Sequence, residues 1–173
     1  MADCPNHLSQ EIDATIDHAY RDTRRRVHLV GHSLGGIFAR IAAVRRPHRV
    51  ASVISLGSPF RGLSLHSVIG ALSEALRGRI RADRPELPRE CGSSRCACAF
   101  GQSLGQQWPR SVRQTAIYTK CDGMVDWRYC LSGKPEVDVE VVGTHLGLLF
   151  NAEVYRHIAN RLAAVTQEGL AAA

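Results

Sequence analysis

The chain has 173 residues and a mass of 19.0 kDa, a length that predicts one domain with a sizeable core. Hydrophobic residues make up 45% of the sequence and charged residues 22%, which excludes wholesale disorder. The formal net charge of +6 comes almost wholly from scattered arginines without interleaved aromatic residues, so we expect no nucleic-acid partner. No apolar run is long enough to span a bilayer, so we expect no transmembrane segment, and the N-terminal sequence has no export-signal pattern, which predicts a cytoplasmic protein.

Six cysteines are present, and we expect them to be thiols rather than disulfides because no export signal is visible. They are Cys4, Cys91, Cys96, Cys98, Cys121 and Cys130. The central three lack the paired spacing of a zinc site, and we expect neither a metal nor an organic cofactor. In an exported protein, Cys121 and Cys130 could instead form a disulfide across the loop between them.

Helical and strand-like patterns alternate along the chain. The first is a helix over residues 8–24, in which Leu8, Ile12 and Ile16 recur at helical spacing. The predicted strands cover residues 27–30, 50–56, 115–119 and 137–142. Two further helices are predicted over residues 34–44 and 151–164. This alternation predicts an α/β fold: a partial doubly wound, mostly parallel sheet with helices on both faces.

A long insertion, about residues 60–114, separates the second and third predicted strands. Its first part has a helical pattern, with Leu65, Ile69, Leu72 and Leu76 on one face, and residues 83–105 have no regular pattern. A connection of this length is typical of a segment that covers a site. We therefore expect a single domain, residues 1–173, with a helical and irregular cap.

The sequence Gly31-His32-Ser33-Leu34-Gly35-Gly36 matches the G-x-S-x-G pattern between a predicted strand and a predicted helix. This context indicates a sharp turn that presents a nucleophile, Ser33, in a strained backbone conformation where glycine neighbours avoid clashes. The turn also directs the backbone N–H of Leu34 toward the position of an oxyanion.

A serine nucleophile needs a base, and His145 is the best placed of the eight histidines. It follows the last predicted strand, at the sheet edge where active sites of open α/β folds gather. Asp122 follows the preceding strand in the same way and is the candidate acid, with Asp126 as the alternative. The order Ser33, Asp122, His145 is the order of nucleophile, acid and base in α/β-hydrolases.

These motifs resemble the α/β-hydrolase superfamily, and within it the bacterial lipases and esterases. Residues 117–125 resemble their acid loop, residues 143–149 their histidine loop, and residues 56–60 the segment after the strand that follows the nucleophile. The resemblance implies a carboxylic-ester hydrolase with Ser33, Asp122 and His145 as its triad, which forms an acyl-enzyme. A small-molecule ester, with an apolar acyl group suggested by the cap helix, is the implied substrate.

The resemblance also has a departure, because family members carry several strands before the nucleophile and only 32 residues precede Ser33 here. We therefore expect an N-terminally truncated fold that lacks a second oxyanion donor and has weak or no activity. The strand over residues 27–30 would then be an exposed edge at which copies of the chain could associate. A non-catalytic fragment with the same fold, or an acyltransferase that uses the same triad, are the alternative interpretations.

Overall fold

The structure is a computed structural model that describes residues 5–61, 75, 78–79, 81–83, 85–86 and 98–171. The helical pattern predicted around Leu65, Ile69 and Leu72 lies outside these residues, as do Cys4, Cys91 and Cys96. Within the described part, no helix is long and apolar enough to cross a membrane.

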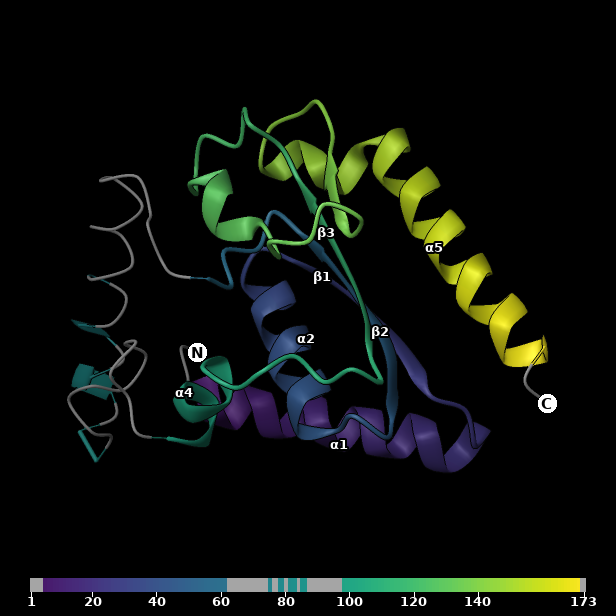
Figure 1. The fold of residues 1–173 in the computed structure, drawn as a ribbon. Coiled ribbons are helices and arrows are strands. Elements are labelled where there is room, and N and C mark those ends of the chain that lie inside the picture. Colours follow the sequence, from purple (N-terminus) through teal and green to yellow (C-terminus); the bar gives the residue numbers. More distant parts are fainter. Residues whose placement is uncertain are drawn as a thin grey trace.

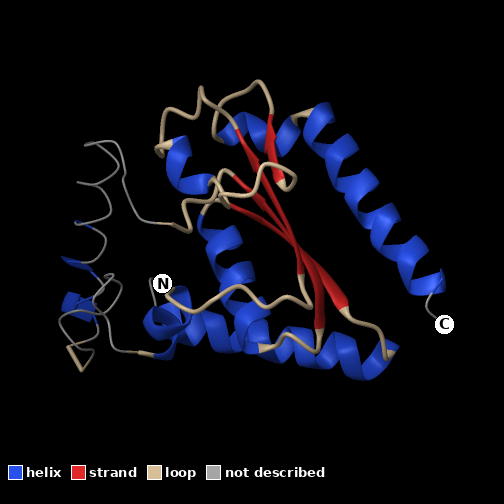
Figure 2. Cartoon of the chain, in the orientation of Figure 1, coloured by secondary structure: helices blue, strands red, loops and turns tan. Residues whose placement is uncertain are grey.

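In the part of the chain that the structure describes, four parallel strands form one sheet in the order β1-β2-β3-β4, with helices on both sides (Figures 1 and 2). The strands are β1 (Val27–His32), β2 (Val50–Leu56), β3 (Arg113–Tyr118) and β4 (Asp138–Glu140). The α-helices are α1 (Pro5–Thr23), α2 (Leu34–Arg45), α4 (Ala99–Leu104) and α5 (Ala152–Ala171), and short 3-10 helices are η1 (Trp127–Cys130) and η2 (Leu146–Phe150). The predicted α/β class with a parallel sheet is confirmed.

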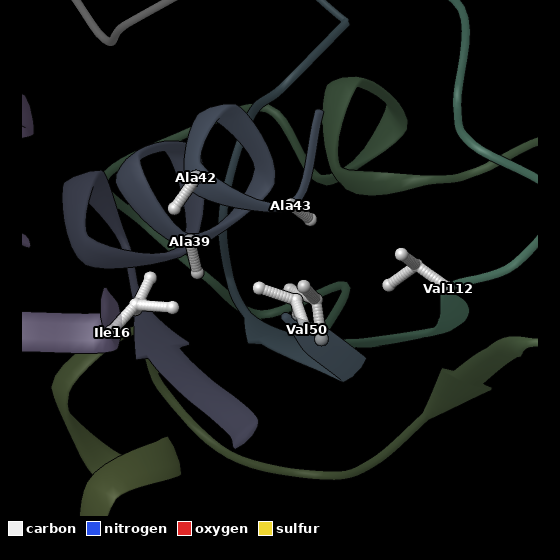
Figure 3. Packing of buried hydrophobic residues seen from close by; sticks show 7 residues of the cluster. Ile16, Ala39, Ala42, Ala43, Val50 and Val112 are labelled. Atoms are coloured by element: carbon white, nitrogen blue, oxygen red, sulfur yellow. The ribbon is translucent and has the colours of Figure 1, made fainter. Parts of the chain in front are cut away.

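Helices α1 and α2 cover one face of the sheet, and α5 covers the other (Figure 1). On the first face, alanines of α2 let this helix approach the sheet closely. The cluster there consists of Ile16, Ala39, Ala42, Ala43, Val50, Val53 and Val112 (Figure 3). On the second face, side chains of α5 pack on strands β2 and β3, in a cluster of Ile54, Leu56, Ile117, Val141, Leu148 and Val154. Burial of each valine, leucine or isoleucine side chain among them contributes about 1.5–3 kcal/mol, so these two clusters hold the sheet between its helices.

Some predicted boundaries differ from the structure. The strand predicted over residues 137–142 is shorter, Asp138–Glu140, because the chain turns away after Val141 and leaves Val142 84% exposed. Part of the region expected to be irregular contains α4, a six-residue helix that packs on α2. A helix this short covers too few turns to produce a periodic pattern in the sequence.

Strand β1 lies at one edge of the sheet and pairs with β2 in the described part of the chain. Its residue Val30 is 48% exposed. The carboxyl end of β1 leads directly into the G-x-S-x-G turn, and the carboxyl ends of β3 and β4 lead into the loops that hold Asp122 and His145. Because all strands are parallel, these three loops share one edge of the sheet.

Candidate active site

The turn between β1 and α2 places Ser33 in a strained backbone conformation. Its φ is +52° and its ψ is −123°, values that a non-glycine residue rarely adopts. The backbone N–H of Ser33 donates to the carbonyl of Leu56 at 2.8 Å, which fixes the turn to the end of β2. Helix α2 begins at the next residue, so its N-terminal dipole lies beside the Ser33 side chain.

Glycines allow the turn to close, and one of them, Gly36, lies just after the G-x-S-x-G motif. A Cβ atom on Gly31 would lie 2.5 Å from the backbone carbon and oxygen of Gly35. A Cβ atom on Gly36 would lie 2.0 Å from the Ser58 hydroxyl oxygen, whereas one on Gly35 would meet nothing within 4 Å. The close approach of Gly36 to Ser58 was not predicted, because it depends on the segment after β2 lying against the start of α2.

His145 and Asp122 form a buried hydrogen-bonded pair at the carboxyl edge of the sheet. The His145 Nδ1–H group donates to Asp122 Oδ2 at 2.7 Å, and the exposed fractions of the two side chains are 3% and 2%. The backbone N–H of His145 also donates to the carbonyl of Asp122 at 3.1 Å. This double contact leaves the Nε2 atom of His145 as the ring nitrogen that can exchange a proton with a substrate or nucleophile.

The loops that carry this pair are fastened to each other by buried polar groups. The Thr119 hydroxyl donates to the carbonyl of Gly143 at 2.7 Å, so the loop after β3 is tied to the loop before His145. The other carboxylate oxygen of Asp122 accepts hydrogen bonds from the backbone N–H groups of Met124 and Val125, at 3.1 and 2.7 Å. Both oxygens of Asp122 are therefore bound.

These contacts determine the charge of Asp122. Burial acts to raise the pKa of this carboxyl, but the hydrogen bond from His145 and those from Val125 and Met124 outweigh it, so the pKa is lowered from its ordinary value of 3.8. Asp122 is consequently ionised at neutral pH, as a group that stabilises an imidazolium ion must be.

Asp126, the alternative acid, lies in a different environment. Its side chain accepts a hydrogen bond from the backbone N–H of Arg128 at 3.0 Å and forms an ion pair with the Arg128 guanidinium at 3.3 Å. It caps the 3-10 helix η1 and makes no hydrogen bond with His145. The structure thus brings Asp122, rather than Asp126, to the imidazole.

The Ser33 hydroxyl makes no hydrogen bond to His145 or to any other group in the part of the chain that is described. The turn and the base are nevertheless in contact through the residue before Ser33. The rings of His32 and His145 have centroids 4.6 Å apart, and His32 Nε2 lies 2.9 Å from the backbone carbonyl oxygen of His145. No pattern in the sequence indicates this contact, since 113 residues separate His32 from His145.

The backbone N–H of Leu34 belongs to the first residue of α2, where a helix offers no internal acceptor. Leu34 is 54% exposed, and Leu146, which follows His145, is 59% exposed. Apolar side chains therefore border both the serine turn and the histidine loop.

A second serine–histidine pair lies on the sheet, away from this edge. Ser52 Oγ and His28 Nδ1 are 2.8 Å apart, and His28 stands four residues before His32 on β1. Burial and the nearby Arg25 and Arg26 guanidinium groups lower the pKa of His28. No carboxylate in the described residues binds this imidazole, so the pair lacks the acid that accompanies His145.

The two cysteines beside the acid loop are free thiols. Cys121 is exposed, and Cys130 is buried. Burial, together with the nearby carboxylates of Asp122 and Asp126, raises the pKa of Cys130 to about 12. Among the residues that the structure describes, no group of His, Cys, Asp and Glu side chains could hold a metal ion.

Comparison with known proteins gives the fold family. The sequence profile of a family described as alpha/beta hydrolase fold matches residues 23–105, which include Ser33. The N-acyl homoserine lactonase AidH superposes on 92% of this chain and 71% of its own, with a TM-score of 0.60 and 16% identity. The chain has the α/β-hydrolase fold. The monoacylglycerol lipase of Paleococcus ferrophilus superposes on 91% of this chain and 76% of its own, with a TM-score of 0.56 and 16% identity.

Curated relatives match a shorter stretch of this chain. A triacylglycerol lipase of Pseudarthrobacter phenanthrenivorans is 38% identical over 61 residues, which are 35% of this chain and 19% of the lipase. The match thus spans about one fifth of the relative's length. The resemblance to α/β-hydrolases, lipases and esterases among them, that the sequence motifs predicted is confirmed.

Proposed function

We propose that this chain is a serine hydrolase of carboxylic esters in which Ser33 is the nucleophile, His145 the general base and Asp122 the acid that orients it. The observation that carries the proposal is the buried 2.7 Å hydrogen bond between His145 and Asp122, at the sheet edge where the strained turn presents Ser33. A buried carboxylate on Nδ1 fixes the tautomer of an imidazole that is to accept a proton at Nε2.

In the proposed reaction, His145 Nε2 removes the proton of the Ser33 hydroxyl as its oxygen attacks the ester carbonyl. The backbone N–H of Leu34 donates to the developing oxyanion, and the dipole of α2 adds positive potential there. His145 then protonates the leaving alcohol, and a water molecule that His145 deprotonates hydrolyses the acyl-enzyme. The Ser33–His145 hydrogen bond forms in the substrate complex, as catalytic hydrogen bonds commonly tighten when substrate binds.

The proposed substrate is an ester with an apolar acyl group. The exposed Leu34 and Leu146 side chains, next to the proposed nucleophile and base, support this assignment. Names of similar proteins, among them a triacylglycerol lipase and a monoacylglycerol lipase, agree with acyl esters as the substrate class. Cleavage of acetyl and octanoyl p-nitrophenyl esters with equal kcat/KM would contradict the apolar preference.

An active-site-directed fluorophosphonate probe tests the nucleophile. We expect the probe to label the wild-type chain and Ser52→Ala, but not Ser33→Ala. Ser52 is the matched control because its hydroxyl is hydrogen-bonded to a histidine, His28, that binds no carboxylate within the described residues. Labelling that persists in Ser33→Ala would overturn the assignment of Ser33 as the nucleophile. A folded wild-type chain that is not labelled would overturn the proposal and favour a non-catalytic α/β-hydrolase fragment.

The fate of the acyl group distinguishes hydrolysis from acyl transfer. We expect the free carboxylic acid to be the main product even when glycerol or a primary alcohol is added. A product mixture dominated by the new ester at millimolar alcohol would assign the same triad to an acyltransferase.

Self-association through β1 is a separate part of the proposal. The strand is at the edge of the sheet, and its exposed Val30 offers an apolar contact. We expect sedimentation velocity to show oligomers of the wild-type chain that Val30→Lys reduces. A monomeric wild-type chain at high concentration would refute this part and leave the catalytic proposal intact.

A further inference from the structure

The contact between His32 and the base loop suggests a role for the residue before Ser33. We propose that His32 is a positioning residue, whose Nε2–H group holds the backbone of His145 beside the serine turn through the 2.9 Å hydrogen bond to its carbonyl. The effect on catalysis rests on the proposed function, whereas the hydrogen bond and its effect on the His145 loop do not.

The chemistry of the two partners fixes the direction of this hydrogen bond. A carbonyl oxygen only accepts, so His32 must carry its proton on Nε2. The rings of His32 and His145 are also in contact, with centroids 4.6 Å apart and planes inclined by 51°. His32 therefore binds the base through a polar contact to its backbone and an aromatic contact to its ring.

His145 is held on both sides of its peptide backbone. Its N–H group donates to the carbonyl of Asp122, and its carbonyl accepts from His32. The first contact ties the base to the acid loop after β3, and the second ties it to the turn after β1. Because His32 is bonded directly to Ser33, this second contact is the link between the proposed nucleophile and the proposed base.

This link sets how far the imidazole can move relative to Ser33. The acid pair alone orients the His145 ring around Asp122 but does not fix the distance from the loop to the serine turn. A misplacement of about 1 Å between reacting groups can reduce a rate by about 100-fold. Loss of the His32 donor should consequently lower kcat while substrate binding changes little.

Three variants of His32 separate the effect of its hydrogen-bond donor from the effect of its aromatic ring. In His32→Gln the side-chain amide nitrogen occupies a position similar to Nε2 and can donate, whereas His32→Phe keeps a ring without a donor. His32→Met has a side chain of similar length with neither a ring nor a donor. The test of the donor can therefore still be made if His32→Phe does not fold. His28→Gln is the matched control, since His28 lies on the same strand and bonds Ser52 instead.

The first measurement is hydrogen exchange of individual amides by NMR, which needs no enzymatic activity. The amide of His145, bound to Asp122, and that of Leu148, bound to Thr144, report on the loop, and amides within α2 report on global opening. We expect at least tenfold faster exchange at the two loop amides in His32→Phe and His32→Met. Exchange in His32→Gln and His28→Gln should stay within about threefold of wild type.

The second measurement is steady-state hydrolysis of a p-nitrophenyl ester. We expect about tenfold lower kcat with KM within twofold in the two variants without a donor, and kcat within about threefold in His32→Gln. Equal behaviour of His32→Gln and His32→Phe in the exchange experiment would overturn the proposal, as would unchanged exchange in all of them. A wild-type chain without esterase activity would refute the proposed function. The exchange experiment would still show whether the hydrogen bond from His32 stabilises the loop of His145.

Discussion

The Nδ1 atom of His145 lies 2.7 Å from Oδ2 of Asp122, and water has almost no access to either side chain. A charge-assisted hydrogen bond of this kind is strong when it is buried and costly when one partner is removed. The pair therefore affects both the chemistry and the stability of the chain, and the two effects can be measured separately.

Replacement of Asp122 by Asn should reduce kcat by about 10³- to 10⁴-fold, since the amide cannot stabilise the imidazolium ion and favours the wrong tautomer. Asp126→Asn is the matched control, because Asp126 lies four residues away and binds Arg128. Its kcat should stay within about threefold of wild type. Steady-state ester hydrolysis measures both, and a larger loss in Asp126→Asn than in Asp122→Asn would reverse the assignment of the acid.

The lowered pKa of Asp122 also predicts a dependence of stability on pH. Because the folded chain holds this carboxyl ionised below its ordinary pKa of 3.8, the carboxylate stabilises the fold above about pH 4. This contribution is lost as pH falls through the lowered pKa. Urea unfolding from pH 7 to pH 3 should therefore show a free-energy difference between wild type and Asp122→Asn that shrinks at the acid end.

The other perturbed carboxyls, Asp13 and Asp17, are present in both proteins, so their effects cancel in that difference. A difference that is constant over the whole range, or grows as the pH falls, would contradict the ionised, hydrogen-bonded state of Asp122.

The sequence was sufficient to predict those parts of the site that depend on local patterns and chain order. Apolar runs alternating with helical patterns imply parallel strands, and parallel strands bring the segments after β1, β3 and β4 to one edge. The positions of Ser33, Asp122 and His145 in three loops at this edge follow from that rule. Asp122 stands closer to the end of its strand than Asp126 does, so the same rule favours it as the acid.

Contacts between distant loops could not be predicted in this way. The hydrogen bond from His32 to His145 and the approach of Gly36 to Ser58 depend on how the loops close over the sheet edge. No periodic pattern in the sequence indicates how these loops pack against one another. The short helix α4 was missed for a related reason, since its packing on α2 stabilises it more than any pattern in its six residues.

Gly57 lies against the acid–base pair and cannot carry a side chain without disturbing it. Its φ is +54°, and a Cβ atom there would lie 3.2 Å from both Asp122 Oδ2 and His145 Nδ1. Gly57→Ala should destabilise the fold by about 1 kcal/mol or more and lower kcat at least tenfold. Thermal unfolding and ester hydrolysis measure the two effects.

Gly133→Ala is the control for backbone strain alone. Its φ is +84°, and its Cβ atom would approach only the flexible end of Arg61, at 3.4 Å. It should lose a similar amount of stability and keep its kcat. Equal kcat values for the two variants would show that the space beside Asp122 and His145 is less restricted than the structure indicates.

The glycines at the start of α2 provide a prediction about the serine turn itself. Gly36→Ala would drive a Cβ atom to 2.0 Å from Ser58 Oγ and 2.9 Å from the carbonyl oxygen of Gly31, so it should lower the free energy of unfolding by about 1–3 kcal/mol. A Cβ atom on Gly35 would meet nothing within 4 Å, and this residue lies in the first turn of α2, where alanine also fits the helical backbone. Gly35→Ala should leave stability unchanged or raise it. Urea denaturation of the two variants decides the matter: if Gly35→Ala proves the more damaging, the turn does not close through the contact between Gly36 and Ser58.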